Sequence, residues 1–297
     1  MSDAATEAFL AHRNLLFTAA YELLGSAADA EDVLQETWLR WVDVDLDTVR
    51  DQRAYLVRIA TRQALGRLRT LGRRKESYVG PWLPEPLLTT ADVAEDVALA
   101  DSVSMAMLLV LETLTPTERA VFLLRDVFAL EYDEIADAVD KTPAAVRQIA
   151  HRARSHVAAR RPRGVVSPEE TRDALEAFQR AIETGDLQSL VDALAPDVVM
   201  LSDGGGVKQA LLQPITGARR VARVLGLGLP RIVGEVSVEP VQINGGPALI
   251  LRIDGEIDSV VAARIDDNRI TGLYIVRNPE KLSRVQQQTR LTTSSSG

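Results

Sequence analysis

The fold of the first half of this chain is decided by residues 115–160, which read TPTERAVFLLRDVFALEYDEIADAVDKTPAAVRQIAHRARSHVAAR. Residues 115–118 combine a capping threonine, a proline at the first helical position and a glutamate three residues after the cap, so a helix begins here. The pattern predicts this helix over 116–128, a short helix over 131–139 and a longer one over 142–160. A short helix, a turn and a longer basic helix form the helix-turn-helix pattern.

The last helix of this pattern has two different faces. Apolar residues recur at helical spacing on the face expected to meet a small core: Val146, Ile149, Ala153 and Val157. The outward face carries four side chains suited to reading base edges, because arginine pairs with guanine and glutamine with adenine: Arg147, Gln148, His151 and Arg152. Arg154 and Arg160 are better placed for phosphate contacts. This helix is a candidate DNA-binding surface.

Residues 5–75 are also predicted to be helical. The segment 26–29 (SAAD) resembles a helix cap, and an apolar stripe at helical spacing follows it, made of Ala30, Leu34, Trp38 and Trp41. The opposite face presents Asp32, Gln35 and Glu36. Residues 52–71 form a second long amphipathic pattern, in which Arg58 and Arg62 stand one turn apart.

Composition limits what the chain can be. Its 297 residues are 46% apolar and 26% charged, which predicts a globular protein of two or three domains. It has no cysteine, and its histidines at 12, 151 and 156 lack metal-ligand spacing, so we expect no disulfide, metal or other cofactor. The first residues lack a basic leader and no apolar run could span a bilayer, so we expect a cytoplasmic protein with no membrane partner.

Charge is distributed in blocks that the net value of −8 conceals. Residues 50–75 carry nine basic side chains and one acidic, and residues 141–163 carry seven basic and none acidic. Residues 76–140 between them carry 14 acidic and two basic side chains. Two separate basic segments joined by an acidic one are suited to gripping a polyanion such as DNA at two places.

Residues 76–104 are predicted to be an acidic, partly extended linker. The segment 80–86 (GPWLPEP) contains three prolines, which remove donors and bias their predecessors to extended conformations, so a regular helix is excluded there.

The second half of the chain has a different pattern, which predicts an α+β unit. Helices are expected over 168–183, 187–194 and about 218–225. The β-branched runs predict strands over 197–202, 232–243, 248–253, 256–266 and 269–276 in a curved antiparallel sheet. The Ser/Thr-rich end, residues 289–297, is predicted to be disordered.

The motifs of the first half resemble extracytoplasmic-function sigma factors of the sigma-70 family. The similar segments are 26–38 (SAADAEDVLQETW), 114–119 (LTPTER), 132–136 (YDEIA) and 146–154 (VRQIAHRAR), in the family's order and spacing. The resemblance covers residues 5–161 and implies that the first unit (region 2) binds core RNA polymerase and melts the minus 10 element. The second unit (region 4) would recognise the minus 35 element.

The resemblance also implies site residues and partners. Polymerase binding, at the beta-prime clamp, falls on Asp32, Gln35 and Glu36, and region 4 would meet the beta flap. Minus 10 DNA falls on Arg53, Arg58, Arg62 and Arg67. Minus 35 DNA falls on Arg147, Gln148, His151, Arg152 and Arg154. Opening DNA requires binding unstacked bases, whose stacking on the protein can offset local unpairing, and the resemblance implies no catalytic residue.

Three further motifs resemble the subgroup of sigma factors with a fused SnoaL-like domain, a cone-shaped fold shared with nuclear transport factor 2. They are 78–86 (YVGPWLPEP), 203–206 (DGGG) and 278–282 (NPEKL). The resemblance implies that this domain regulates the sigma portion through an intramolecular contact, with candidate residues Trp82, Pro84, Glu85, Asp203, Gly204, Gly205, Gly206, Lys208, Asn278 and Lys281. The glycines, which expose backbone, are expected to meet the Trp82 linker or the polymerase.

The fold expected is therefore multidomain: two all-α domains, the region 2 bundle and the region 4 helix-turn-helix, followed by an α+β curved-sheet domain. The expected boundaries are 1–75, 76–104, 105–163, 164–288 and 289–297. Two other functions remain open. One is a polymerase-independent helix-turn-helix regulator with a ligand-sensing domain. The other is an enzyme of the SnoaL-like fold fused to a DNA-binding module, whose pocket could be lined by Asp203, Asp254, Asp258 and Tyr274.

Overall fold

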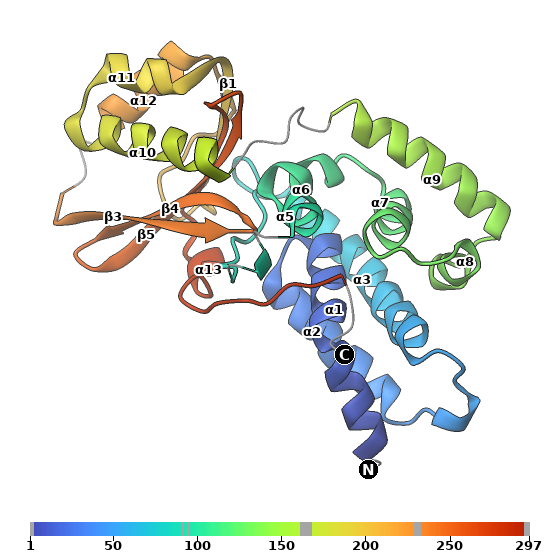
Figure 1. The fold of residues 1–297 in the computed structure, drawn as a ribbon. Coiled ribbons are helices and arrows are strands. Elements are labelled where there is room, and N and C mark those ends of the chain that lie inside the picture. The colour runs from blue at the N-terminus through green and yellow to red at the C-terminus, as the bar shows by residue number, and fades with distance from the viewer. Residues whose placement is uncertain (1–2, 91, 94–95, 161–167, 229–232, 294–297) are drawn as a thin grey trace.

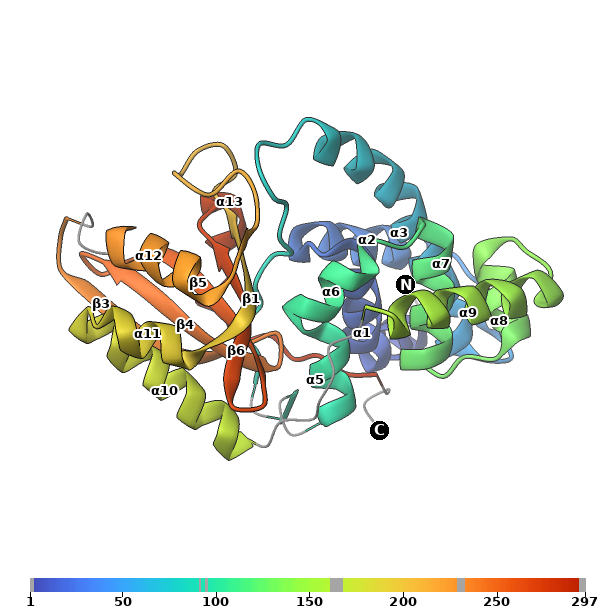
Figure 2. The same ribbon diagram turned by 90° about the horizontal axis from the view of Figure 1, so that it is seen from above.

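The chain forms a helical lobe followed by an α+β lobe (Figure 1). A computed structural model describes residues 3–90, 92–93, 96–160, 168–228 and 233–293. The helical lobe takes the residues up to 160 and the α+β lobe takes those from 168. Figure 2 shows α5 and α6 lying between the sheet and the rest of the helical lobe.

The first bundle consists of α1 (Asp3–Leu24), α2 (Ala27–Trp41) and α3 (Gln52–Glu76), with a 3-10 turn, η1 (Leu46–Thr48), before α3. Ser26 caps α2 by accepting the Asp29 backbone N–H, as the SAAD segment predicted. Trp41 is fully buried and its Nε1 donates to the Ala5 carbonyl at 2.8 Å. The helical prediction for residues 5–75 is confirmed, apart from the short connection between α2 and α3.

The helix-turn-helix unit contains α6 (Met105–Leu111), α7 (Pro116–Phe122), a π-helical turn η2 (Leu123–Val127), α8 (Tyr132–Val139) and α9 (Pro143–Ala158). Thr115 and Glu118 form the predicted capping box, and Thr142 caps α9. Asp140 turns the chain between α8 and α9 with φ +56°, a left-handed conformation that aspartate tolerates better than most residues. The predicted core residues of α9 are buried: Val146, Ile149, Ala153 and Val157.

The acidic linker is more ordered than its composition suggested. Residues 81–87 form no helix, as the prolines require, but Leu83, Pro84, Glu85 and Leu87 are buried. Helix α5 (Val97–Val103), capped by Asp96, lies inside the segment predicted to be a linker. The sequence pattern did not predict α5, because this seven-residue helix has too few apolar residues to form a long periodic stripe.

The α+β lobe contains a six-stranded sheet with its longer helices on one face and a short helix against the other. Its helices are α10 (Pro168–Thr184), α11 (Leu187–Ala193), α12 (Ala218–Gly228) and the short α13 (Pro279–Leu282). Its strands are β1 (Leu194–Asp203), β2 (Ile215–Thr216), β3 (Val236–Ile243), β4 (Gly246–Ile253), β5 (Glu256–Asp266) and β6 (Arg269–Val276). β2 was not predicted, and Ile232, the predicted first residue of β3, lies outside the described residues.

The sheet order is β2-β1-β6-β5-β4-β3, and the predicted antiparallel pairing is confirmed except at one strand pair. β1 pairs with β6 in parallel, whereas the other neighbouring strands pair antiparallel. The reason lies in the connection: α12 and four strands separate β1 from β6 in the chain, so no hairpin dictates their relative direction.

Both faces of the sheet are buried, but against different partners. The inner face packs on α10, α11 and α12 around Phe178, Leu190, Val221 and Leu273. The outer face, with Ala248, Val260 and Tyr274, packs on side chains from the sigma-like half: Leu83, Met105 and Ala106. The two lobes therefore share one hydrophobic cluster.

The end of the chain also returns to the helical lobe, as the red trace from α13 toward α1 shows in Figure 1. Thr289 N–H donates to the Leu88 carbonyl at 2.7 Å, and Leu291 is buried in the core of the first bundle. Thr292 N–H donates to Thr18 Oγ1 of α1 at 3.0 Å. The prediction of disorder is therefore wrong for residues 289–293, because these backbone groups find partners that composition cannot reveal. Residues 294–297 lie outside the described residues.

The last turns of α1 carry a buried polar face on which several helices meet. Arg119 of α7, 2% exposed, donates to the Glu22 carbonyl through Nε at 3.0 Å and Nη2 at 2.7 Å. The Ser102 hydroxyl of α5 donates to Glu22 Oε1 at 2.8 Å. The other carboxyl oxygen of Glu22, Oε2, is buried and has no hydrogen-bond partner. Burial raises the pKa of the Glu22 carboxyl to about 8, although the Ser102 hydroxyl and the Arg119 charge act to lower it.

The raised pKa predicts that the protein loses stability as pH rises. Between about pH 4.5 and 8 the folded chain holds a proton on Glu22 that the unfolded chain has released. The stabilisation from this proton is therefore fully present below pH 4.5 and is lost progressively as the pH rises through 8. We expect the free energy of unfolding to fall by up to about 1.4 kcal/mol per pH unit in this window. Urea denaturation at pH 5, 6, 7 and 8 measures it.

Glu22→Gln removes the titrating group and should flatten this slope, whereas Glu183→Gln, at an exposed site on α10, should leave it as in the wild type. An unchanged slope in Glu22→Gln would contradict the assignment.

Candidate nucleic-acid interface

Helix α9 presents its predicted DNA-facing side chains together on an exposed face. Arg147, Gln148, His151 and Arg152 are all exposed, opposite the buried face of the same helix. The Arg147 guanidinium lies 5.4 Å from the centre of the Tyr132 ring of α8. This cation–π contact holds the Arg147 side chain beside α8. These four side chains could enter a major groove without rearrangement of α9.

Arg154, predicted for the same DNA element, is placed differently. Its Nε donates to Asp126 Oδ1 of η2 at 2.7 Å, so the side chain is paired within the helix-turn-helix unit. Arg160 approaches the His156 carbonyl at 3.5 Å near the end of α9. A DNA phosphate would have to displace Asp126 to reach Arg154.

The predicted minus 10 arginines of α3 lie against the helix-turn-helix unit. Arg53 Nη2 donates to the Phe128 carbonyl at 2.9 Å, and Arg62 Nη2 donates to the Asp137 carbonyl of α8 at 2.7 Å. Arg58 instead stacks on Tyr55, with 4.4 Å between the guanidinium and the ring centre. We call this packing of α8 on α3 the closed arrangement. In it, two of the four arginines are already bonded to the helix-turn-helix unit.

The fourth arginine, Arg67, lies with the predicted polymerase-binding residues of α2. Its Nε donates to Asp29 Oδ1 at 2.6 Å, its Nη2 bonds to Asp32, and its Nη1 lies 3.7 Å from Glu36 Oε1. Burial acts to lower the pKa of Arg67, but the hydrogen bond to Asp29 and the three carboxylates raise it overall. Arg67 therefore joins α3 to α2 in this structure and does not present its charge freely to DNA.

The outer face of α2 remains accessible. Gln35 and Glu36 are exposed, and Leu39, one turn further on, is 65% exposed. Leu39 was not among the residues predicted for polymerase binding. Its place one turn after Gln35 on the polar face was the available signal, since a leucine interrupting such a face marks a contact surface.

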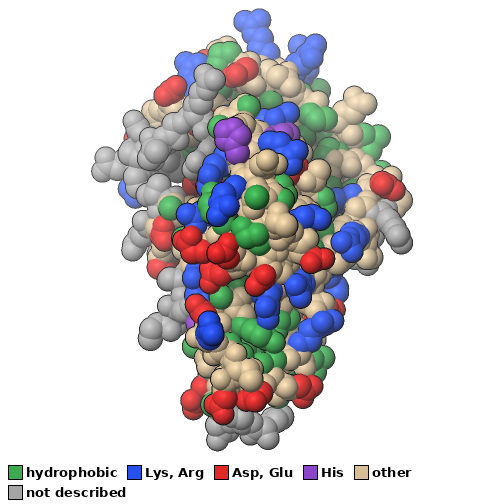
Figure 3. All heavy atoms as spheres, turned by 90° about the vertical axis from the view of Figure 1, so that its right-hand side faces the viewer, with side chains coloured by type: hydrophobic (Ala, Val, Ile, Leu, Met, Phe, Trp, Pro, Cys, Tyr) green, Lys and Arg blue, Asp and Glu red, His purple; other side chains and the backbone are tan. Residues whose placement is uncertain are grey.

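Figure 3 looks onto the face that carries α8 and α9 and shows how charge is arranged there. Lys and Arg side chains gather above and below a band that contains Asp and Glu side chains. Helix α8 supplies Asp133, Glu134 and Asp137, and it lies between basic α3 and basic α9. The acidic helix offsets the repulsion that two basic surfaces would otherwise exert on each other.

The DGGG and NPEKL motifs meet the linker motif around the carboxylate of Asp203, whose side chain is fully buried. Its Oδ1 accepts from Tyr78 Oη at 2.5 Å and from the Gly205 N–H at 3.0 Å. Its Oδ2 accepts from the Leu83 N–H at 2.9 Å and from Lys281 Nζ at 2.7 Å. We call these residues the linker clamp. It fixes the extended linker to the α+β lobe.

Lys281 is held in the clamp by aromatic rings as well as by charge. Its Nζ lies 3.4 Å from the centre of the Trp82 ring and 5.1 Å from that of Tyr78, and donates to the Leu83 carbonyl at 2.5 Å. Burial lowers the pKa of Lys281 to about 8 against the opposing effect of Asp203. Burial also raises the pKa of Tyr78, reinforced by its hydrogen bond to Asp203.

The glycines of the DGGG motif are required by close approach. A Cβ on Gly205 would lie 2.5 Å from Asn278 Cγ, and one on Gly204 would lie 2.1 Å from the Lys208 carbonyl oxygen. A Cβ on Gly206 would lie 3.4 Å from Val79 Cβ, so this glycine faces the linker. Asn278 Nδ2 donates to Tyr78 Oη at 2.8 Å, which adds a contact between the two motifs.

The remaining linker candidates lie at the start of α2. Glu85 Oε2 accepts from the Ala27 N–H at 2.7 Å, so its carboxylate sits at the N-terminus of α2 beside the Ser26 cap. Pro84 lies beside Gly25: a Cβ added to Gly25 would lie 3.7 Å from Pro84 Cβ. The linker thus contacts both lobes.

The structure does not bring Lys208 to the linker. Its Nζ donates to Asp258 Oδ1 at 3.0 Å, and Arg277 also pairs with Asp258, at 3.0 Å. Sequence position beside the glycines suggested a linker contact, but the turn that the glycines make directs this side chain to β5.

The four polar residues considered for a catalytic pocket are not gathered in one site. Asp203 is in the clamp, Asp258 is neutralised by two cations, and Asp254 accepts the Glu235 N–H at 2.9 Å in a turn. Tyr274 belongs to the cluster between the sheet and the helical lobe.

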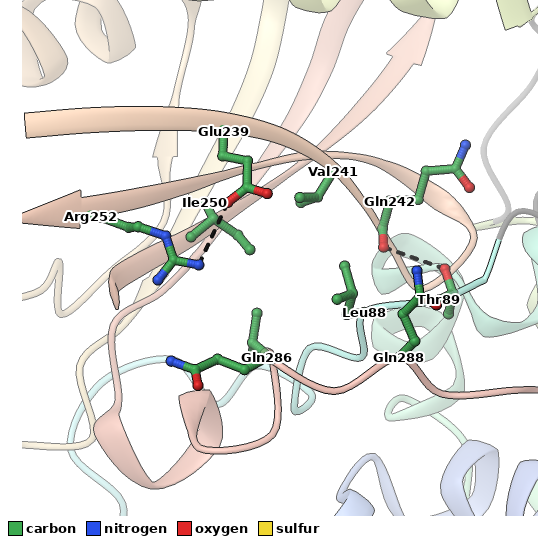
Figure 4. A pocket seen from close by; sticks show the side chains of 10 residues that line it. Leu88, Thr89, Glu239, Val241, Gln242, Ile250, Arg252, Gln286 and Gln288 are labelled. Atoms are coloured by element: carbon green, nitrogen blue, oxygen red, sulfur yellow. Dashed lines mark hydrogen bonds and ion pairs between the residues drawn. The ribbon is translucent and has the colours of Figure 1, made fainter. Parts of the chain in front are cut away.

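Figure 4 shows an open groove of about 700 Å³ at the edge of the sheet, between β3, β4, the linker and the C-terminal segment. Leu88, Val241 and Ile250 form its apolar floor, and Gln286 and Gln288 line the C-terminal side. Its two ionisable residues, Glu239 and Arg252, pair with each other at 3.5 Å. This lining contains no nucleophile or general-base pair.

The part of the chain that the structure describes gathers no candidate metal ligands and forms no membrane-spanning helix. In the ranges that the structure describes, no three His, Cys, Asp or Glu side chains converge on a possible metal position. Among those same residues, no helix has the length and apolar character needed to cross a membrane.

Comparison with known proteins places two families on the helical lobe. The family described as Sigma-70 region 2 matches residues 8–74, which span α1 to α3. The family described as Sigma-70, region 4 matches residues 104–157, which span α6 to α9.

Similar proteins extend the resemblance to the α+β lobe. The ECF RNA polymerase sigma factor SigJ of Mycobacterium tuberculosis is 32% identical over 289 residues, 93% of this chain and 92% of that protein. The probable ECF RNA polymerase sigma factor SigI of the same species is 29% identical over 283 residues, 94% of this chain and 95% of that protein. The crystal structure of SigJ superposes with a TM-score of 0.74 and 30% identity, covering 95% of this chain and 99% of that chain.

The clamp predicts a local change when its cation is removed. Lys281→Met keeps the side-chain volume but leaves the buried Asp203 carboxylate without its counter-ion, so the linker should open more often. We expect the Leu83 amide, which donates to Asp203, to exchange roughly 30-fold faster or more. Hydrogen exchange resolved by residue measures it.

Lys208→Met is the matched control, because Lys208 is 43% exposed and its partner Asp258 keeps Arg277. The clamp assignment fails if the two variants change Leu83 exchange equally.

Proposed function

Because this chain belongs to the extracytoplasmic-function RNA polymerase sigma factors, we propose that its α9 recognises the minus 35 element, its α3 the minus 10 element and its α2 the polymerase. The protein is an alternative sigma factor that directs RNA polymerase to promoters. The α2 face would meet the beta-prime clamp, region 4 the beta flap, and the protein would act in the cytoplasm beside the chromosome.

The exposed face of α9 is the observation that carries this proposal. Arg147, Gln148, His151 and Arg152 project from one face of a capped helix in a helix-turn-helix unit. Arginine and glutamine at such positions make paired hydrogen bonds to purine edges in the major groove. The exposed α2 face with Gln35, Glu36 and Leu39 favours polymerase binding over a regulator that acts without polymerase.

Binding both promoter elements requires the closed arrangement to open. The minus 10 and minus 35 elements lie, by their names, about 25 base pairs apart, or about 85 Å of duplex. Helices α3 and α9 both pack against α8, so their axes lie no more than about 20 Å apart, or two helix diameters. Region 4 must therefore leave region 2, and the bonds from Arg53 and Arg62 to the helix-turn-helix unit must break.

The α+β lobe is a regulatory domain in this proposal, acting through contacts with the sigma portion. Phe178, Leu190, Val221 and Leu273 fill the space between its helices and sheet, where an enzyme of this shape would need a cavity. The clamp supports regulation, since it fixes the linker between regions 2 and 4 to the α+β lobe. A ligand bound in the groove of Figure 4 would contact both the linker and the α+β lobe, so the same domain would then regulate in response to that ligand.

Run-off transcription with purified core RNA polymerase tests the proposal directly. We expect a discrete transcript from a cognate promoter only when this chain is added, because the chain supplies promoter recognition. Absence of any transcript that depends on the chain, over a promoter library, would favour the polymerase-independent regulator.

Substitution in α9 tests which side chains contact the promoter. Arg147→Ala and Gln148→Ala should each weaken promoter binding by the holoenzyme by about 1–3 kcal/mol and relax sequence choice at one base pair. Arg180→Ala, an exposed arginine of α10, is the control and should leave promoter affinity unchanged. Fluorescence anisotropy with promoter variants measures both effects, and equal affinities for all three variants would remove the assignment.

A further inference from the structure

The turn between β3 and β4 lies outside every sequence motif, yet it is buried. Asn244 and Gly245 form a two-residue hairpin turn with φ values of +55° and +68°. Hairpin tips normally face solvent, because buried loops carry polar groups that need partners. Asn244 is 0% exposed. Its partners therefore have to come from elsewhere in the chain.

Three segments far away in the sequence supply those partners. Asn244 Nδ2 donates to Tyr21 Oη of α1 at 2.6 Å and to the Val103 carbonyl of α5 at 2.9 Å. Its Oδ1 accepts from the Leu87 N–H of the linker at 2.9 Å, and its own N–H donates to the Leu87 carbonyl at 2.9 Å. Both side-chain donors and the side-chain oxygen are thus used, which makes the site specific for asparagine.

The shape of the site is as specific as its hydrogen bonds. A Cβ on Gly245 would lie 2.7 Å from Ala100 Cα of α5, so only glycine fits there. Gly245 N–H donates to Thr89 Oγ1 at 3.0 Å. Tyr21 Oη donates in turn to the Glu85 carbonyl at 2.7 Å, which links the site to the linker. The turn is a knob in a socket built from α1, the linker and α5.

We propose that the Asn244–Gly245 turn is a docking knob through which the α+β domain binds regions 2 and 4 only while they are packed together. The proposal rests on the sigma function above. The socket needs both α1, which belongs to region 2, and α5, which leads directly into region 4. Ser102 and Arg119 hold these helices together at Glu22. When region 4 departs, α5 leaves α1 and the socket loses a wall.

The knob and the linker clamp should therefore respond differently to opening. The clamp holds only linker residues, Tyr78, Trp82 and Leu83, against the α+β domain, so it can persist when region 4 moves. The knob requires the closed arrangement and must disengage. By thermodynamic linkage, a domain that binds the closed arrangement more tightly also stabilises it by the same amount. The knob thus opposes promoter engagement from a lobe that touches no DNA.

Energy transfer between region 2 and region 4 tests the knob without polymerase. The chain has no cysteine, so cysteines introduced at Thr70 of α3 and Lys141 before α9, both exposed, can be labelled specifically. Asn244→Gly keeps the positive φ without strain and removes the side-chain bonds. Asn268→Gly, an exposed turn residue with φ +57°, is the matched control.

We expect loss of energy transfer at a lower urea concentration in Asn244→Gly than in the wild type, with Asn268→Gly unchanged. At fixed urea the ratio of open to closed molecules should rise at least about tenfold, since each net hydrogen bond changes an equilibrium constant about fivefold. Tyr21→Phe keeps the ring in the core and removes one partner, so it should shift the midpoint in the same direction by less. Equal midpoints for Asn244→Gly and Asn268→Gly overturn the knob.

Addition of core polymerase separates this proposal from the sigma function. Hydrogen exchange should then show faster exchange at the Leu87 amide of the knob and continued protection at the Leu83 amide of the clamp. Protection retained at Leu87 in the complex contradicts the knob. Failure of the chain to associate with polymerase contradicts the sigma function, and the urea midpoints still decide the knob.

Discussion

The arrangement of the whole chain depends on the buried polar face at the end of α1. Thr18, Tyr21 and Glu22, spaced i, i+3 and i+4, lie on one face of the helix, and each is bonded to a segment far away in the sequence. Buried polar groups are costly without partners, so this face is satisfied only when α5, α7, the β3–β4 turn and the C-terminal segment are all in place. The closed arrangement is therefore specified by polar bonds as well as by apolar packing.

The contacts that hold the closed arrangement together include arginines of α3 that are proposed to bind the promoter. The face of α9 that suits a DNA groove is exposed, whereas α3 has two of its four candidate arginines bonded to the helix-turn-helix unit. Acidic α8 lies between the two basic helices and offsets their repulsion. A chain with a net charge of −8 can thus hold two basic helices, the candidate DNA-binding surfaces, close together in a compact form.

The candidate site was predictable where its determinants are local. The two faces of α9 follow from helical spacing and capping within residues 142–160, and the structure places them as expected. Roles that depend on distant partners were not predictable. Arg67 is drawn to the carboxylates of α2 and Lys208 to Asp258, because each side chain finds the nearest opposite charge in three dimensions. Asn244 carried no signal beyond a turn, since its partners lie more than a hundred residues away.

The sequence by itself determined α1 to α3 and α7 to α9, the caps at Ser26, Thr115 and Thr142, the α+β character of the second half and the placement of charge in blocks. These features depend on residues within one or two turns of each other. Tertiary structure alone decided the parallel pairing of β1 with β6, the ordering of residues 289–293, the clamp around Asp203 and the closure of α8 on α3. Each of these joins groups whose separation along the chain leaves no periodic trace, so only the folded chain brings their charges and hydrogen-bonding atoms within reach.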